Sequence, residues 1–374
     1  MNNKALKDNK TILICSNYAW TIVNFRLPLI KSLKEKGYRI FVVTEYDGYE
    51  TQIAECVDKI QPLFISRKGI NPLIDIITML NLIKIFFKLR PSHLLLFTIK
   101  PVIYGAIAAK LFNINTIVMI TGLGTAFIAN NWMTRLVMRL YKFALSSVST
   151  VFFQNTDDKN LFLSKSLIDS QACKLTPGSG IDTNQFPYRT LPSGDEISFI
   201  LIARMIWDKG IGEYVEAVRI IKAKYPNTKF QLLGALDIQN RTAISTKQMT
   251  SWVNEGFVEY LGDTDDVRPY IQEATCVVLP SYREGTSRVL LEAASMGRPI
   301  IASDVPGCRE IVENRANGLL CLSKDSFDLS DKIEIMINLS HEERKMMGIK
   351  GRKKIEENFN QEIVNELYFE AIKN

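Results

Sequence analysis

The sequence predicts an α/β protein in which two domains each hold a parallel β-sheet. Short, continuous apolar runs alternate with longer helical stretches in both halves of the chain. Continuous apolar strands are typical of parallel sheets that are covered on both faces. The length of 374 residues suits two domains of ordinary size. A stretch rich in Pro, Gly, Ser and Thr, residues 177–191, predicts the boundary between them.

The first half contains five apolar runs that predict buried strands, at residues 11–15, 39–44, 94–97, 116–120 and 150–153. A helix is expected at 25–36, where Gly37 ends it. The longest apolar stretch, residues 73–89, is interrupted by charged side chains and is shorter than a membrane-spanning helix needs to be. It predicts an amphipathic helix that either packs on the sheet or lies in a membrane interface.

The second half repeats the pattern, with strands expected at residues 197–202, 229–233, 258–261, 276–279 and 299–303. Apolar side chains from Ile363 to Ile372 predict a helix in the last segment. The predicted organisation is therefore a domain at 1–178, a second domain at 179–355 and a final helix at 356–374.

The net charge of +6 conceals an asymmetry between the halves. Residues 1–178 hold 22 Lys and Arg against 11 Asp and Glu, and the remainder holds 24 against 29. A basic first half predicts an anionic partner, for which membrane phospholipid or a lipid diphosphate fits as well as nucleic acid. The alternative is a solvated basic face without a partner.

Cysteine and histidine usage excludes several classes of site. The six cysteines, at positions 15, 56, 173, 276, 308 and 321, form no C-x-x-C pair, and several lie in apolar runs. This pattern is typical of reduced cysteine in a cytoplasmic protein. His93 and His341 are the two histidines, so a zinc site or a Ser-His-Asp triad has few candidate residues. The polar segment Met1 to Lys10 predicts no signal peptide.

The most informative stretch is residues 280–293. The apolar run 276–279 ends in Pro-Ser, so a buried strand ends there, and Thr286 or Ser287 can then cap a helix. Glu284 and Glu292 lie on either side of that helix start. Backbone N–H groups at a helix N-terminus bind phosphate, and carboxylates accept hydrogen bonds from sugar hydroxyls. The stretch predicts a nucleotide-sugar pocket.

Glu284-x7-Glu292, with Gly285 after the first Glu, resembles the signature of glycosyltransferase family 4. Members of that family are retaining enzymes with the GT-B fold, two Rossmann-like domains facing across a cleft. The resemblance continues through Ala203-Arg204, Lys209-Gly210 and residues 293–301, 304–307 and 317–319. Residues 98–105 and 121–127 resemble a narrower branch, which extends lipid-diphosphate-linked sugars for bacterial O-antigen, capsule and protein glycosylation. Enzymes of this fold often return their last helix to the first domain.

The resemblance implies a donor site in the second domain. Arg204 and Lys209 match the Arg-x4-Lys pair of the family and would hold the phosphates of the leaving nucleoside diphosphate. Both follow a predicted strand, and two cations there would stabilise the charge that develops on the leaving group. Glu284 would hold the donor sugar and Glu292 the ribose hydroxyls.

Neighbouring residues complete this expected donor site. The backbone N–H groups of Gly285, Thr286 and Ser287 would contact the phosphates. Gly234, after a buried strand, would flank the nucleotide base. The run Asp263 to Asp266 imitates a D-x-D metal motif, but we interpret it as a loop and helix cap. We therefore expect no metal and no other cofactor.

Four residues of the first domain are candidates for the acceptor site. The glycine-free segment Asn17 to Arg26 replaces a glycine-rich loop of many relatives, and Arg26 either contacts the acceptor diphosphate or forms a local salt bridge. Gly122 and Gly124, beside Lys100, could form the acceptor floor, although glycines also serve tight turns. Whether Lys100 contacts the donor sugar or the acceptor stays open.

The expected function is that of a retaining, metal-independent glycosyltransferase peripheral on the cytoplasmic face of the plasma membrane. It would transfer a hexose or N-acetylhexosamine, GalNAc as the first choice, from a UDP-sugar to an undecaprenyl-diphosphate-linked saccharide. The expected partners are the donor, the lipid-linked acceptor and the anionic membrane surface, with no nucleic acid. The alternatives are a family 4 transferase with a soluble acceptor and a noncatalytic nucleotide-sugar-binding protein.

Overall fold

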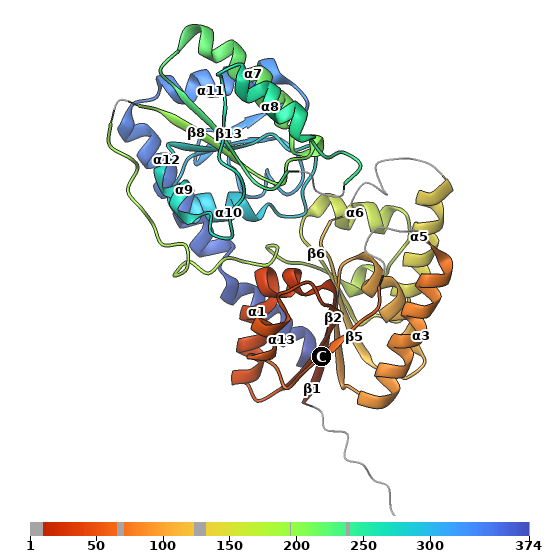
Figure 1. Cartoon of the computed structure of the whole chain (residues 1–374). Helices are drawn as coiled ribbons and strands as arrows, with labels where there is room; N and C mark the ends of the chain where they lie inside the picture. The colour runs from red at the N-terminus through yellow and green to blue at the C-terminus, as the bar shows by residue number, and fades with distance from the viewer. Residues whose placement is uncertain (1–9, 66–70, 123–131, 195, 237–239, 374) are drawn as a thin grey trace, which may run out of the picture. The chain divides into compact units, whose positions relative to one another are not determined.

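The chain forms two compact units in a computed structural model that describes residues 10–65, 71–122, 132–194, 196–236 and 240–373. Unit 1 comprises residues 1–179 and 362–374, and unit 2 comprises residues 180–361 (Figure 1). The chain therefore passes between the units at 179/180, one residue from the boundary expected from the sequence. The expected helix at 356–374 is divided, because α12 (His341–Asn358) ends within it and α13 (Gln361–Lys373) follows.

Unit 1 contains a parallel sheet whose described strands are β1 (Thr11–Tyr18), β2 (Arg39–Glu45), β3 (Lys59–Pro62), β4 (His93–Phe97), β5 (Asn115–Ile120), β6 (Thr150–Phe153) and β7 (Cys173–Leu175). Their order is β3-β2-β1-β4-β5-β6-β7. The direction of winding changes between β1 and β4, which pair in parallel through Ile12 to Cys15. Such a switch point is where ligands bind in open α/β sheets, at the carboxyl ends of the strands.

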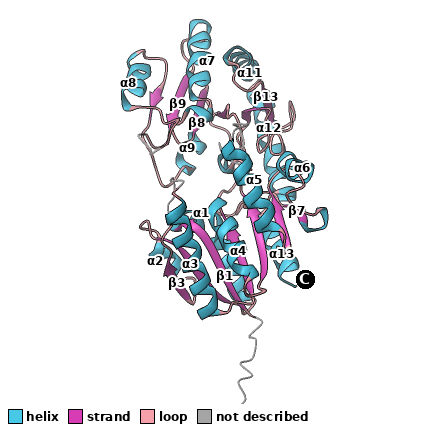
Figure 2. Ribbon diagram, turned by 90° about the vertical axis from the view of Figure 1, so that its right-hand side faces the viewer, coloured by secondary structure: helices cyan, strands magenta, loops and turns pink. Residues whose placement is uncertain are grey.

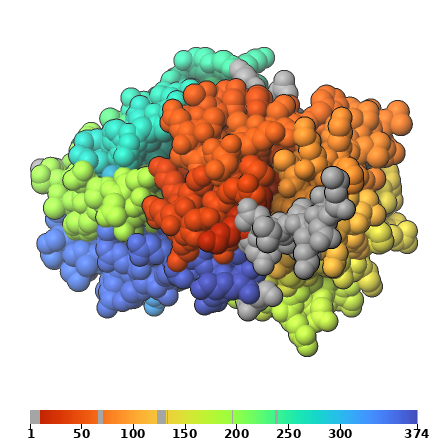
Figure 3. Space-filling model, turned by 90° about the horizontal axis from the view of Figure 1, so that it is seen from below, coloured from red at the N-terminus to blue at the C-terminus, as the bar shows by residue number. Residues whose placement is uncertain are grey.

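The described helices of unit 1 are α1 (Ala19–Glu35), α2 (Glu50–Ala54), α3 (Pro72–Leu89), η1 (Pro101–Gly105), α4 (Ala106–Lys110), α5 (Trp132–Leu145), α6 (Thr156–Ser164), η3 (Ser170–Ala172) and α13. Leu13 and Cys15 face α3, α4 and α5, whereas Ile12 and Ile14 face α1 and α13. This alternation follows from the two-residue repeat of a strand. Figure 2 shows the strands of this sheet in magenta among its helices, and Figure 3 shows the blue C-terminal residues beside the red N-terminal ones.

Unit 2 contains a second parallel sheet, with described strands β8 (Ser198–Ile202), β9 (Lys229–Leu233), β10 (Glu259–Tyr260), β11 (Cys276–Leu279), β12 (Ile300–Ser303) and β13 (Gly318–Cys321). The strand order is β10-β9-β8-β11-β12-β13, so winding reverses between β8 and β11. The described helices are η4 (Trp207–Lys209), α7 (Ile211–Lys224), α8 (Thr246–Asn254), α9 (Arg268–Glu273), α10 (Arg288–Ser295), α11 (Ser326–Asn338) and α12. Phe199 and Leu201 face α7, α8 and α11, and Ile200 and Ile202 face α9 and α10.

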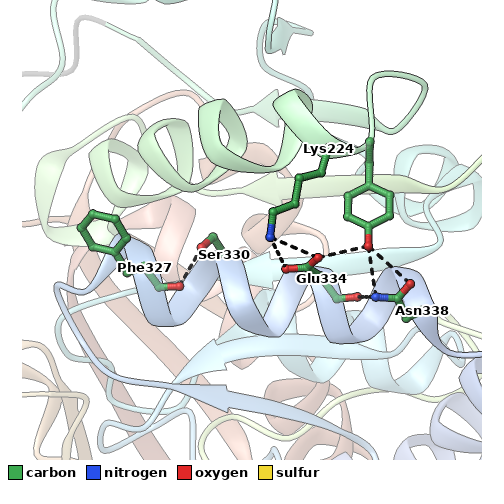
Figure 4. Close-up of polar contacts among 6 residues, drawn as sticks. Lys224, Phe327, Ser330, Glu334 and Asn338 are labelled. Atoms are coloured by element: carbon green, nitrogen blue, oxygen red, sulfur yellow. Dashed lines mark hydrogen bonds and ion pairs between the residues drawn. The ribbon is translucent and has the colours of Figure 1, made fainter.

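A polar network ties the end of α7 to α11 at the surface of unit 2 (Figure 4). Lys224 Nζ lies 3.0 Å from a carboxylate oxygen of Glu334, and the Tyr225 hydroxyl donates to the same carboxylate at 3.1 Å. Asn338 Nδ2 donates to the Tyr225 hydroxyl at 3.2 Å. The network lies at the edge of the contact between α7 and α11, whose centre is apolar. An exposed ion pair of this kind contributes little to stability by itself.

The two ends of unit 2 lie side by side. Ile181 and Asn360 form a parallel bridge, in which Ile181 N donates to Phe359 O at 2.9 Å and Gln361 N donates to Ile181 O at 3.1 Å. Arg352 Nη1 donates to Phe186 O at 2.9 Å, and Arg298 Nη2 donates to Thr190 O at 2.8 Å. Arginines of unit 2 therefore fix the backbone of its first residues.

The segment Asn17 to Arg26, expected as a loop, belongs mostly to regular structure. Asn17 and Tyr18 end β1, and α1 begins directly at Ala19. The expected helix start at residue 25 is wrong, because α1 begins six residues earlier and includes Pro28 in its interior.

The six cysteines are all free thiols, and only Cys56 among them is not fully buried. Burial raises the pKa of the Cys15, Cys276 and Cys308 thiols. Within the described residues, no helix combines the length and the apolar composition that crossing a bilayer requires.

The packing of α12 on the end of α10 yields a stability prediction. A Cβ at Gly348 would lie 2.0 Å from the carbonyl oxygen of Gly297, whereas a Cβ at Gly351 would meet Ala294 at an ordinary 3.6 Å. Gly348→Ala should therefore destabilise unit 2 by about 1–3 kcal/mol through overpacking. Gly351→Ala, the control on the same helix, should be neutral or stabilise by up to about 1 kcal/mol through helix propensity. Urea unfolding of both variants checks this, and equal midpoints would contradict the close approach.

Candidate functional site

Two loops meet at the switch point of the unit 2 sheet. The loop after β8 carries Arg204 and Lys209, and the loop after β11 carries Glu284. Because β8 and β11 are parallel neighbours, their carboxyl ends lie at the same edge of the sheet. The topology alone thus brings the predicted phosphate-binding and sugar-binding residues to one place.

Lys209 and Glu284 form an ion pair between Nζ and Oε1. Both side chains are mostly buried, with 19% and 13% of their surface exposed. The Ser281 hydroxyl donates to the same Oε1 at 2.7 Å. A partly desolvated charge pair with a further hydrogen bond has a fixed geometry, so this carboxylate and this ammonium are held in place before any ligand arrives.

The two loops touch through their backbones as well. Gly210 has φ 72°, and a Cβ there would lie 2.1 Å from the carbonyl oxygen of Pro280. Tyr282 N donates to Asp208 O at 2.9 Å, and the Tyr282 hydroxyl donates to Glu213 at 2.7 Å. The glycine after Lys209 is therefore required for the approach that lets Lys209 reach Glu284.

A third segment supports the carboxylate loop from the carboxyl end of β12. Glu284 N donates to Pro306 O at 3.1 Å, and Ser287 N donates to Gly307 O at 3.0 Å. The second bond corrects one expectation, because the Ser287 N–H has a protein acceptor and would have to give it up to contact a phosphate. Ser287 occupies the N-cap position of α10, but its side chain makes no capping hydrogen bond. Gly285 and Thr286 are half-buried in the same loop.

Arg204 and Gly234 lie at neighbouring strand ends. Arg204 is exposed just beyond β8. Gly234 follows β9 with φ 144°, and a Cβ there would lie 1.8 Å from Ala203 O. Its N–H donates to Gly262 O at 2.7 Å, and its carbonyl accepts from the Tyr260 hydroxyl at 2.8 Å. Gly234 therefore lets the β9 end pack against the residue that precedes Arg204, and its contact with a base stays a prediction.

Glu292 lies on α10 and is buried, with 9% of the residue exposed. Its Oε1 accepts from Arg288 Nε at 2.9 Å. Burial raises the pKa of the Glu292 carboxyl above its ordinary value, and the positive charge of Arg288 opposes that rise. Sequence reasoning missed Arg288, although a residue four positions before a helical Glu is a standard ion-pair partner.

The run Asp263 to Asp266 makes contacts typical of a structural loop. Asp266 accepts from the backbone N–H of Arg268 at 3.0 Å and from its Nε at 2.7 Å, at the start of α9. The guanidinium of Arg268 holds the pKa of Asp266 below its usual value. These contacts fit the interpretation of the run as a loop and helix cap. Among the described residues, no group of three His, Cys, Asp or Glu side chains has a geometry that could hold a metal ion.

Lys100 and Gly122 lie just beyond the carboxyl ends of β4 and β5. Lys100 Nζ pairs with Asp75 Oδ1 at 2.6 Å, and burial together with a hydrogen bond to Asp75 raises the pKa of Tyr104. Gly122 follows β5 with φ 123°. Gly124 lies outside the described residues.

Arg26 takes a position that the sequence did not indicate. It is 4% exposed on α1, its guanidinium stacks on the Phe97 ring at 4.1 Å, and its Nη2 lies 2.9 Å from Met119 Sδ. Stacking on an aromatic ring in the core is a common use of arginine. This burial favours a packing role over contact with a diphosphate.

Both halves of the chain are similar to known glycosyltransferases. Residues 196–338 match the family model described as glycosyl transferases group 1, and residues 11–155 match the model described as glycosyl transferase 4-like. Among solved structures, sucrose-phosphate synthase from Thermosynechococcus elongatus superimposes with a TM-score of 0.80 at 19% identity, over 97% of this chain and 98% of that one. Anabaena Alr3699/HepE, in complex with UDP and glucose, gives 0.81 at 17%, over 97% and 99%.

The fold is GT-B. Curated relatives include named glycosyltransferases. A Campylobacter jejuni protein named N,N'-diacetylbacillosaminyl-diphospho-undecaprenol alpha-1,3-N-acetylgalactosaminyltransferase is 28% identical over 334 residues, covering 85% of this chain and 86% of its own. The Staphylococcus aureus capsular polysaccharide biosynthesis glycosyltransferase CapM is 28% identical over 163 residues, covering 44% and 42%. These matches support glycosyl transfer by a GT-B protein.

The contact between the two unit 2 loops can be tested by substitution. Gly210→Ala should lower the free energy of unfolding by clearly more than Gly256→Ala, because Gly256 has a similar φ of 78° but open space around its Cβ position. Both variants carry the left-handed backbone cost of about 1–2 kcal/mol. The excess for Gly210→Ala, about 1–3 kcal/mol from the clash, reports the Pro280 contact. Equal losses in chemical denaturation would show that the loops do not touch.

Proposed function

We propose that this GT-B chain is a retaining, metal-independent glycosyltransferase. It transfers a hexose or N-acetylhexosamine, GalNAc first, from a UDP-sugar to an undecaprenyl-diphosphate-linked saccharide of a bacterial surface glycan. The observation that carries the proposal is the meeting of Lys209 with Glu284 at the switch point of unit 2. A cation for phosphate and a carboxylate for hydroxyls are the groups that a nucleotide-sugar requires.

The donor assignment combines this geometry with the comparisons. The Anabaena HepE structures contain UDP, UDP-glucose, or UDP with glucose. In this chain Arg204 is exposed and Lys209 is held by its ion pair, so an incoming diphosphate would meet one solvent-exposed and one positioned cation. Both would stabilise the negative charge that the leaving UDP gains in the transition state, without a metal ion.

The Campylobacter relative supports the proposed acceptor and stereochemistry. The name of the Campylobacter relative specifies a diphospho-undecaprenol acceptor and an alpha-1,3 product. Because UDP-GalNAc carries its sugar in α linkage, an α product means retention. Retention implies attack from the face of the leaving group, with a phosphate oxygen taking the proton of the acceptor hydroxyl. Glu284 would then orient the sugar rather than act as the base.

The direct test is transfer of radiolabelled GalNAc from UDP-GalNAc to an undecaprenyl-diphosphate-linked saccharide. We expect product with the α configuration, and we expect the rate to persist in excess EDTA because the phosphate contacts are side-chain cations. A panel of UDP-hexoses run in parallel ranks the donors. Activity that EDTA abolishes and Mg²⁺ or Mn²⁺ restores would overturn the metal-independent mechanism.

Removal of either cation should slow the reaction without unfolding the protein. Arg204→Ala and Lys209→Ala should each lower kcat by roughly 10²-fold or more, as loss of transition-state charge stabilisation does. Lys229→Ala is the matched control, because Lys229 also belongs to an ion pair, at 3.5 Å from Glu259, but lies at the amino end of β9. Turnover near the wild-type rate in either loop variant would remove the phosphate assignment.

The structure also supports the proposed association with the inner face of the plasma membrane. Residues 76–156 contain eight Lys and Arg and no Asp or Glu. On α3, apolar side chains that are 47–70% exposed form one stripe with the helical spacing of three and four residues: Leu73, Ile76, Ile77, Leu80 and Phe87. Exposed Lys84 and Lys88 adjoin this stripe.

The helix α5 repeats the combination of apolar and basic side chains. Trp132, Leu136 and Phe143 are 43–64% exposed, and Arg135, Arg139 and Lys142 are exposed beside them. Both helices pack on the same face of the sheet, with η1 and α4 between them. Aromatic and aliphatic side chains among cations, without acidic ones, suit the headgroup region of an anionic bilayer.

Binding to vesicles should depend on both lipid charge and salt. The full chain should co-sediment with anionic vesicles more than with neutral ones, and salt should release it, since each cation near anionic lipid contributes about 1 kcal/mol. Leu80→Gln combined with Phe87→Gln should weaken binding several-fold through lost apolar burial. Phe327→Gln, at a 73% exposed residue of α11, is the control and should change nothing. Equal binding to both lipids, or none, would leave the basic face without this role.

A further inference from the structure

The surroundings of Glu292 suggest a role for Arg288. The two residues lie one turn apart on α10, and the contact between Arg288 Nε and Glu292 Oε1 is 2.9 Å. Exposed fractions are 27% for the arginine side chain and 12% for the glutamate. The contact engages one carboxylate oxygen, and an ionised carboxylate offers about four lone-pair positions in all. The ion pair therefore leaves capacity for the two hydroxyls of a ribose.

Arg288 also contacts the first residues of unit 2. Its Nη1 donates to Gly180 O at 2.9 Å, and its guanidinium lies 5.7 Å from the centre of the Phe186 ring. The side chain thus has three anchors from two parts of the sequence. A guanidinium held at several points has one orientation, and it imposes that orientation on the carboxylate with which it pairs.

We propose that Arg288 is a positioning residue for the nucleotide ribose, holding the carboxylate of Glu292 ready to accept from the ribose hydroxyls. This inference rests on the proposed function, because Glu292 meets a ribose only if the donor is a nucleotide-sugar. It adds a residue outside the pattern that links the chain to family 4.

The positive charge of Arg288 also helps Glu292 to accept hydrogen bonds. Burial raises the pKa of the Glu292 carboxyl, the negative charge of Asp266 also raises it, and Arg288 lowers it by its charge and its hydrogen bond. Without Arg288 the pKa would rise further, so a larger fraction of the carboxyl would be protonated as the pH falls. A protonated carboxyl keeps fewer acceptor positions for the ribose.

The test compares UDP with 2'-deoxy-UDP and 3'-deoxy-UDP by titration calorimetry. For the wild type we expect UDP to bind roughly 10-fold or more tightly than a deoxy analogue, the usual effect of a hydrogen bond to a charged group. Arg288→Met should remove most of this preference. Its loss of UDP affinity should be larger at pH 6 than at pH 8.

The matched control is Arg352→Met. Arg352 also pairs with a glutamate four residues later, Glu356 at 2.6 Å, and also donates to the first segment of unit 2, at Phe186 O. Arg352 therefore makes the same kinds of contact as Arg288 but does not pair with Glu292. The preference for UDP over its deoxy analogues should therefore survive in Arg352→Met.

Two further variants separate positioning from a general loss of structure. Arg288→Lys keeps the charge but loses the fork geometry, so it should retain the pH profile of the wild type and lose part of the ribose preference. In a Glu292→Ala background, Arg288→Met should change the UDP affinity little further, because residues that act through one contact are not additive. The lysine variant also serves if the methionine variant does not fold.

The outcomes distinguish this inference from the proposed function. A wild type that binds none of the three nucleotides overturns both. A wild type that prefers UDP, with an Arg288→Met variant that keeps the same preference and pH dependence, overturns the role of Arg288 alone. Full additivity of the two substitutions would do the same.

Discussion

Parallel strand pairing is the constraint on which the remaining features of this molecule depend. In a parallel sheet the carboxyl ends of all strands lie at one edge. Where the strand order reverses direction, the loops that follow two neighbouring strands lead to opposite faces of the sheet. In unit 2 the reversal lies between β8 and β11, whose following loops carry Lys209 and Glu284. In unit 1 it lies between β1 and β4, where Asn17 N donates to the Thr98 hydroxyl at 3.1 Å. Candidate site residues far apart in sequence are therefore neighbours by topology.

Close backbone contacts then fix the positions of the loops that the strand order makes neighbours. Gly210, Gly234 and Gly307 each occupy a position where a Cβ would overlap a neighbouring loop. The loops of unit 2 thus contact one another through their backbones, and these contacts support the mostly buried ion pair of Lys209 and Glu284. Preorganisation of this kind removes the reorganisation that would otherwise oppose charge stabilisation during a reaction.

The sequence predicted the architecture well because buried parallel strands are continuous apolar runs. The strands β6, β9 and β11 have the predicted bounds. Strands β3, β7 and β13 were missed: β3 has no fully buried residue and ends in Pro62, and β7 has only three residues. The edge strands β3 and β7 lack the apolar signal because solvent or a loop covers one side. Strand β13 is apolar and mostly buried, but it has only four residues.

The candidate site was predictable where a motif names a residue and a strand end places it. Glu284 and Lys209 meet both conditions, whereas Glu292 matches the motif but lies on α10. Arg26 met neither, because a sequence does not tell a buried arginine stacked on Phe97 from one that faces a ligand. The hydrogen bond from Ser287 N to Gly307 O was also unforeseeable, since its two residues belong to loops after different strands.

The return of α13 to unit 1 has a consequence for synthesis of the chain. Ile12 and Ile14 are covered on one face by Val364, Tyr368 and Ile372 in the same apolar cluster. Unit 2 is one continuous segment, whereas unit 1 needs residues from both ends. On the ribosome, unit 2 can therefore finish folding while the sheet that emerged first still lacks one of its covering helices. The unit that is translated first is completed last, and loss of α13 would leave Ile12 and Ile14 without this cover.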